Sequence, residues 1–183
     1  MGLSANETIK LEPAAPADYP AIVALTNRAY RDTGPQASWN VEAMIEGERL
    51  TEPLLRDDLA KAPGAHLLIW RDPAGEGAGQ HLGHVWLEPG QDGAWYLGLL
   101  TVRPDRQDRK LGRALLAASE DYARERGATR IELTVVNARD TLIAWYERRG
   151  YVRTGVTRPW PYDNPRIGRP TQDVCFVVLE RAI

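Results

Sequence analysis

Residues 103–116 read RPDRQDRKLGRALL, and they join an apolar run to a helical pattern. The stretch places five basic side chains where a helix begins. Exposed backbone N–H groups at a helix start already carry about +0.5 of a charge, so basic side chains there are unfavourable unless an anion binds. A strand that turns tightly into a helix gathers such N–H groups around one point, which suits phosphate. We therefore expect a polyphosphate site here; the alternative is an exposed helix start that Asp105 and Asp108 partly neutralise.

Composition narrows the classes of partner. The chain has 183 residues and a net charge of −2, so no nucleic acid or anionic membrane is expected as a partner. One cysteine, Cys175, excludes an intrachain disulfide and a cysteine-based zinc site. His81 and His84 should face opposite sides of one strand, so no metal is expected. The chain shows no signal-peptide core and no apolar run near the ~20 residues that span a bilayer, which predicts a cytoplasmic protein.

Hydrophobic periodicity predicts strands and helices that mix rather than alternate strictly. No repeat or linker divides the chain, so residues 1–183 should form one domain whose sheet is mixed and carries helices on both faces. The expected strands are Ile9–Glu12, Ala65–Trp70, His81–Glu88, Ala94–Val102, Arg130–Val136, Tyr151–Thr157 and Asp173–Leu179. The expected helices follow Asp18, fill much of Asn40–Lys61, run from Leu111 to Gly127 and cover Asp140–Arg149.

Two segments together resemble the GNAT superfamily of N-acyltransferases. The first resembles its acetyl-CoA motif, V-x-P-x-x-[QR]-x-x-G-x-G/A-x-x-L, and departs at Lys110, where the family usually has its first glycine. The second, VNARDTLIAWYERRGY at 136–151, resembles the N-x-x-A-x-x-x-Y-x-x-x-G-[FY] segment, with a longer spacing from the asparagine to the tyrosine. The matching residues are Val102, Pro104, Gln107, Gly112 and Leu115 in the first segment, and Asn137, Ala144, Tyr146, Gly150 and Tyr151 in the second.

The resemblance implies an α/β (α+β) fold with a mostly antiparallel central sheet of about seven strands and about four helices. It also implies acetyl-CoA as cosubstrate, no metal, and acetyl transfer to a primary amine. The pantetheine arm would lie along Leu99–Val102, the pyrophosphate would sit on the next helix start, and the Tyr146 hydroxyl would protonate the leaving thiolate. The implied cofactor-binding residues are Leu100, Thr101, Val102, Gln107, Asp108, Arg109, Lys110, Leu111, Gly112, Arg113, Asn137 and Tyr146.

The general base stays open at this point. Many relatives carry a glutamate on the fourth strand, and Tyr96 occupies the aligned position. Glu88, Asp92, Tyr96 acting through water, or a solvent relay could each accept the proton of the amine.

The acceptor should lie beneath the first helices and the proline-rich loop at 158–170. Glu42 and Glu46, expected one helical turn apart, could meet a cationic amine, and a stiff loop could close over it. The candidate acceptor residues are Tyr30, Glu42, Glu46, Trp160 and Tyr162, with Trp39, Arg49 and Trp86 also considered. A small-molecule amine is the favoured acceptor; protein N-termini or lysines, and a non-catalytic acyl-CoA-binding role, are the alternatives. A homodimer is left open.

Overall fold

The computed structural model describes residues 9–34, 37, 41–73, 78–105 and 110–183. Its centre is a seven-stranded sheet in the order β1-β3-β4-β5-β6-β9-β7. Along the sheet the strands are β1 (Leu11–Pro13), β3 (His66–Arg71), β4 (His81–Pro89), β5 (Ala94–Val102), β6 (Arg130–Val136), β9 (Cys175–Ala182) and β7 (Val152–Pro159). Neighbouring strands pair antiparallel except β5 and β6, which pair in parallel. The predicted mixed, mostly antiparallel sheet is confirmed.

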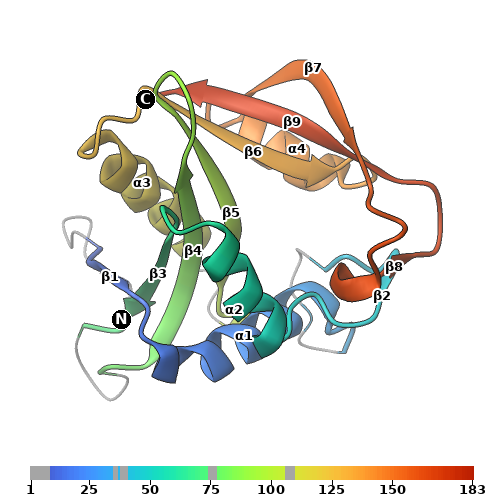
Figure 1. Cartoon of the computed structure of the whole chain (residues 1–183), viewed down its shortest axis with the longest axis horizontal. Helices are drawn as coiled ribbons and strands as arrows, with labels where there is room; N and C mark the ends of the chain where they lie inside the picture. Colours follow the sequence, from blue (N-terminus) through green and yellow to red (C-terminus); the bar gives the residue numbers. More distant parts are fainter. Residues whose placement is uncertain (1–8, 35–36, 38–40, 74–77, 106–109) are drawn as a thin grey trace.

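Helices cover both faces of this sheet (Figure 1). They are α1 (Tyr19–Arg31), α2 (Glu52–Lys61), α3 (Leu111–Arg124) and α4 (Asp140–Glu147), with one-turn 3₁₀ helices η1 (Pro16–Asp18) and η4 (Pro165–Ile167). Side chains alternate across a strand, so neighbouring residues serve different layers. On β3, Leu67 packs in one core cluster with Ile22 of α1 and Leu55 of α2, whereas Leu68 packs in another with Leu116 of α3.

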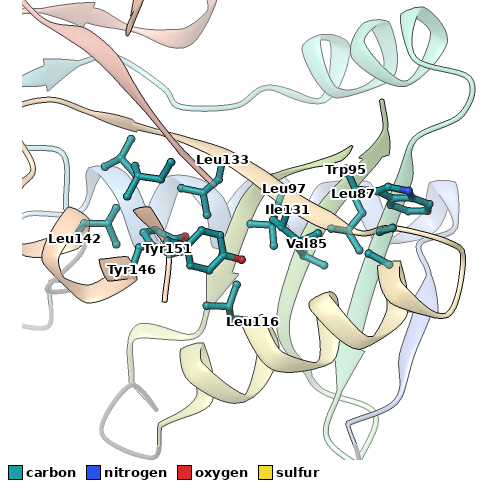
Figure 2. Close-up of a cluster of buried hydrophobic side chains, with 14 of the residues drawn as sticks. Val85, Leu87, Trp95, Leu97, Leu116, Ile131, Leu133, Leu142, Tyr146 and Tyr151 are labelled. Carbon is teal, nitrogen blue, oxygen red and sulfur yellow. The ribbon is translucent and has the colours of Figure 1, made fainter. Parts of the chain in front are cut away.

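The layer beneath α3 and α4 is the larger of these cores. Figure 2 shows Leu116 of α3 and Tyr146 of α4 meeting Leu133 of β6 and Val85 of β4. Burying large apolar side chains from four elements fixes the position of both helices against the sheet, since each buried side chain of this kind contributes about 1.5–3 kcal/mol. The start of α3 and the inner face of α4 are thereby held beside the centre of the sheet.

The segment before α2 differs from the sequence prediction. The second helix begins as expected, with Thr51 accepting a hydrogen bond from the Leu54 amide (3.3 Å). Residues 41–50, however, form no helix, and Ile45–Glu46 is instead a short strand, β2, paired with β8 (Arg169–Pro170). The prediction of a helix there is wrong because long-range pairing overrides a weak apolar stripe.

The prediction for the two strand histidines is also wrong. His81 and His84 share one side of β4, and their ring nitrogens Nε2 and Nδ1 lie 3.1 Å apart. The register between β3 and β4 shifts at Trp70/Arg71, which places one extra residue on β4. A bulge of this kind reverses the alternation of side chains, and the sequence carries no signal for it.

Candidate active site

The site arises where the two parallel central strands separate. β5 pairs with β6 only through Ala94–Tyr96, and the two strands then diverge (Figure 1). The cause lies in β5, whose register against β4 shifts between His84 and Trp86, and where Leu99 has a left-handed φ of 48°. A bulge bends and twists its strand, so β5 leaves β6 and exposes backbone groups that a flat sheet would pair.

An open cavity of about 370 Å³ fills this separation. Its walls come from β5, β6, α1, α4, the segment before α2, the end of β7 with the stretch that follows it, and the start of β9. The lining residues are Tyr30, Glu42, Arg49, Tyr96, Leu97, Gly98, Leu99, Leu100, Leu133, Thr134, Val135, Val136, Arg139, Leu142, Tyr146, Arg158, Pro159, Pro161 and Phe176. Two of the predicted cofactor residues, Leu100 and Tyr146, are therefore brought together with two predicted acceptor residues, Tyr30 and Glu42.

Tyr146 projects from α4 into the inner part of the cavity. Its ring packs edge-on against Trp145 (4.9 Å between centroids) and Tyr151 (5.4 Å), which fixes its direction. No residue of the described chain hydrogen-bonds its hydroxyl, which leaves that group for a ligand. Burial raises the pKa of the Tyr146 hydroxyl well above the usual value of about 10, so it stays protonated at neutral pH.

Tyr96 crosses the point where the strands separate. Its hydroxyl lies 3.2 Å from Oγ1 of Thr134 on β6, and its ring lies against Gly98, where an added Cβ would come within 2.9 Å of the ring. Of the three side chains considered as general base, Tyr96 lines the cavity, and Glu88 and Asp92 are not among the lining residues. Glu88 instead accepts a hydrogen bond from the Trp86 indole (3.2 Å).

Tyr30 ties α1 to the bulged part of β5. Its hydroxyl donates to the Leu100 carbonyl (3.1 Å), and the Thr101 hydroxyl donates to the Leu99 carbonyl (3.0 Å). Thr101 is buried and Val102 packs in the core with Leu111, so only their backbone is suited to a ligand.

The first turn of α3 has backbone N–H groups without partners inside the helix, the general feature on which the predicted anion site depends. Lys110 precedes the helix in the left-handed conformation (φ 59°), where the family usually has glycine. Leu111 is buried and anchors the turn, whereas Arg113 is exposed. Among the described residues, a Cβ added at Gly112 would meet Trp145 alone, at 3.8 Å, so no described neighbour demands glycine there. The predicted ligands Gln107, Asp108 and Arg109 lie outside the described residues.

Asn137 lies at the end of β6 and is already engaged. Its Oδ1 accepts from the Cys175 amide (3.1 Å) and its own amide donates to the Cys175 carbonyl (2.9 Å). Asn137 is not among the residues that line the cavity. In this structure its side chain holds β6 to the start of β9.

The two predicted acidic residues are not brought together. Glu42 is 6 % exposed and forms ion pairs with Arg31 and with Arg139, the latter at 3.2 Å. Glu46 is exposed on β2, outside the cavity lining. The expected pair of carboxylates for a cationic amine is therefore wrong, because the residues are not on a helix and Glu42 is neutralised by two guanidinium groups.

The aromatic candidates of the proline-rich loop also differ from their predicted places. Trp160 is 5 % exposed and stacks on Phe176 (5.1 Å between centroids), outside the lining residues. Tyr162 is 57 % exposed, and its hydroxyl accepts from the Val174 amide (3.0 Å). The loop meets the cavity instead through Arg158, Pro159 and Pro161.

Three arginines line the cavity, two of which the sequence analysis missed. Arg139 and Arg158 had no motif to mark them, and Arg49 was only one of several candidates. Arg139 follows the predicted ligand Asn137 by two positions, but its direction depends on the turn before α4. The burial of Glu42 requires arginine partners and so points to Arg139, but this burial is known only from the structure.

The described residues contain neither a cluster of metal ligands nor a membrane-spanning helix. No group of three or more histidine, cysteine, aspartate or glutamate side chains in that part of the chain could hold a metal ion. Within the same residues, none of the helices combines the length and the apolar character needed to cross a bilayer.

Comparison with known families decides the kinship of this chain. The model of the acetyltransferase (GNAT) family matches residues 21–151, which include both β5 and the start of α3. The chain belongs to the GNAT acetyltransferase family. The resemblance seen in the two sequence motifs is thereby confirmed.

Several curated GNAT relatives carry one name. A mycothiol acetyltransferase from Clavibacter sepedonicus is 37% identical over 139 residues, covering 72% of this chain and 43% of that protein. Another from Salinispora tropica is 33% identical over 138 residues, covering 75% of this chain and 42% of that protein. The chain thus spans less than half the length of these two curated relatives.

Solved GNAT structures share the fold at low sequence identity. The ribosomal-protein-alanine N-acetyltransferase from Brucella melitensis has a TM-score of 0.66 at 19% identity, with 96% of this chain and 100% of that chain covered. A phosphinothricin acetyltransferase from Sinorhizobium meliloti, solved with acetyl-CoA, has a TM-score of 0.65 at 15% identity, covering 97% and 89%. These likenesses establish the fold alone.

Proposed function

We propose that this GNAT chain is a single N-acetyltransferase domain that moves an acetyl group from acetyl-CoA to the primary amine of a small molecule. The observation that carries the proposal is the cavity between β5 and β6, into which α4 directs the unpartnered Tyr146 hydroxyl. A cytoplasmic location and a reaction without metal are part of the proposal.

The residues present fit acetyl-CoA. Backbone groups of β5 beyond Tyr96 have no partner strand in β6, so an extended pantetheine arm with its amides can occupy that place. The N-terminal turn of α3, with Lys110 and Arg113 beside it, suits a pyrophosphate. The open space at Gly112 suits a close approach of that group to the backbone.

Acetyl transfer needs a neutral amine, a stabilised oxyanion and a protonated leaving thiolate. The amine nitrogen bonds to the acetyl carbon, the carbon–sulfur bond breaks, and the sulfur takes a proton. We assign that proton to Tyr146, whose hydroxyl is protonated at neutral pH and regains a proton from solvent after the transfer. Tyr96, 3.2 Å from Thr134, is the side chain best placed to pass the amine proton on through water.

A small acceptor fits better than a peptide. The β2–β8 pair joins the segment before α2 to the stretch after β7, and both segments contribute to the cavity walls. A cavity of about 370 Å³ lies at the small end of the range for small-molecule sites. The names of the curated relatives, mycothiol acetyltransferases, support a small-molecule acceptor.

Thermal denaturation with acetyl-CoA tests the cofactor half of the proposal. A ligand that binds the folded state at 100 times its Kd stabilises it by about 2.7 kcal/mol, so Tm should rise by several degrees. Gly112→Asp places a negative side chain against the expected pyrophosphate and should abolish the shift. Gly64→Asp is the matched control, because a Cβ there meets no atom within 4 Å. A full shift in Gly112→Asp would place the pyrophosphate elsewhere.

An acetyl-CoA-dependent screen over amines, amino acids and aminoglycosides tests the transfer itself, with release of free thiol as the readout. Turnover of small amines is the expected result. Turnover of peptides alone would favour the protein acetyltransferase alternative, and acetyl-CoA binding without any turnover would favour a binding module.

A further inference from the structure

We propose that the acceptor carries an anionic oxygen group, a carboxylate or a phosphate, in addition to its amine, and that Arg49 binds this group. The inference rests on the proposed acetyltransferase function and names its substrate class. It replaces the earlier expectation of an acidic site for a purely cationic amine.

The charges that line the cavity favour an anion. Arg49, Arg139 and Arg158 face a single lining carboxylate, Glu42, which leaves an excess of two positive charges among the described lining residues. Glu42 already pairs with Arg139 and with Arg31 behind it. Arg158 pairs with Glu132 at 2.5 Å on the exposed side. A cationic amine without a compensating anion would therefore enter a site of its own sign.

Arg49 is the arginine whose charge is not compensated. It is half-buried, and no carboxylate of the described chain forms an ion pair with its guanidinium group. The group lies over the Tyr30 ring, 5.7 Å from its centroid, a position that holds it by a cation–π contact. A half-buried guanidinium without an ionic partner is costly unless a ligand supplies one, and its fork of donors matches a carboxylate or phosphate.

The position of Arg49 places this anion near the reacting groups. Its partner Tyr30 also donates to the Leu100 carbonyl on the bulge (3.1 Å), so one side chain links Arg49 to the part of β5 where the acetyl group is expected. Arg139 approaches the same ring from another direction (6.0 Å). An acceptor held by its anion at Arg49 would thus present its amine toward β5 and the Tyr146 hydroxyl.

Matched pairs of acceptors test the proposal with the full chain and acetyl-CoA. The first pairs are α-amino acids with their α-amides, which differ in a carboxylate. The second pair is glucosamine 6-phosphate with glucosamine, which differ in a phosphate. We expect the anionic member of at least one pair to have a kcat/KM at least tenfold higher. Arg49→Gln should lower kcat/KM for that member by 10- to 100-fold, through KM, and should leave its neutral partner and the acetyl-CoA KM nearly unchanged.

Two further variants keep the result interpretable. Arg49→Lys retains the charge and should restore part of the lost kcat/KM. Arg56→Gln removes an equal charge from α2, outside the cavity, and should change nothing. Equal or better turnover of the neutral members would overturn the proposal of an anionic group on the acceptor and would leave the proposed acetyltransferase function intact. A rise in the acetyl-CoA KM of Arg49→Gln would move Arg49 to the cofactor side. No turnover of any amine would refute both proposals.

Discussion

Among single residues, Tyr146 has the most direct part in the proposed reaction. Tyr146→Phe removes one hydroxyl and leaves the edge-on packing against Trp145 and Tyr151 in place. We expect kcat to fall by about 10²-fold, as for other positioned proton donors, with the acetyl-CoA KM nearly unchanged. Steady-state kinetics by thiol release measure both quantities.

The control for this change is Tyr122→Phe, which removes a hydroxyl that bonds His66 (3.0 Å) away from the cavity. Its kcat should equal that of the unmodified chain. If Tyr146→Phe also keeps its full kcat, the tyrosine serves packing only and the thiolate takes its proton from solvent.

At the level of single residues, the sequence identified residues that line the cavity where a local motif defines their position. Tyr146 and Leu100, both named from the resemblance, line the cavity, and their role in binding acetyl-CoA stays a prediction. The neutralisation of Glu42 could not be predicted, since its two arginine partners come from α1 and from the turn before α4. Long-range ion pairs have no signature in the spacing of residues.

At the level of elements, the turn into α3 makes a specific prediction about stability. Lys110 holds a left-handed φ of 59°, which costs a non-glycine residue about 1–2 kcal/mol. Lys110→Gly removes that cost and adds some unfolded-state entropy, so the free energy of unfolding should rise by about 0.5–1 kcal/mol. Urea denaturation measures it as a higher midpoint at unchanged slope.

Ala117→Gly, on the same helix, should lower the free energy of unfolding and serves as the control. Ala117 is exposed within α3, where glycine costs about 0.5–1 kcal/mol. A loss of stability in both variants would show that Lys110 makes a contribution that outweighs its backbone strain.

Element boundaries were largely predictable, and their pairing was not. The extent of β6 was predicted as it is observed, Arg130–Val136, because a regular apolar alternation ends at turn residues. Residues 41–50 were assigned to a helix from a weak stripe, and pairing of β2 with β8 decides otherwise. The bulge at Leu99, which opens the cavity, leaves no mark in the sequence because leucine is an unusual residue at positive φ.

Across the whole molecule, a short polar chain links α1 to β4 through side chains on one face of the sheet. His84 is fully buried and its Nε2 lies 2.9 Å from the Thr26 hydroxyl of α1, while its Nδ1 meets His81. Burial lowers the pKa of His81 to about 4 and the pKa of His84 well below its usual value. Both rings are therefore neutral in the folded protein near pH 7.

This arrangement predicts that stability falls as the pH drops from about 6.5 to about 4. Over that range the unfolded chain binds protons at histidines, whose usual pKa is about 6.5, and the folded chain does not, so protonation favours unfolding. Asp18, beside His81 through Arg71, has a pKa lowered below its usual 3.8, so its own loss of charge lies below this range. Each such proton can contribute at most about 1.4 kcal/mol per pH unit, and His81, being half-buried, should contribute less.

Urea unfolding at pH 7.5, 6.0 and 5.0 should show the decline, and His81→Gln, which keeps a polar side chain but cannot titrate, should make it shallower. A stability that is flat across these three pH values would mean that the histidines titrate in the folded chain as they do in the unfolded chain, so that folding is not linked to their protonation.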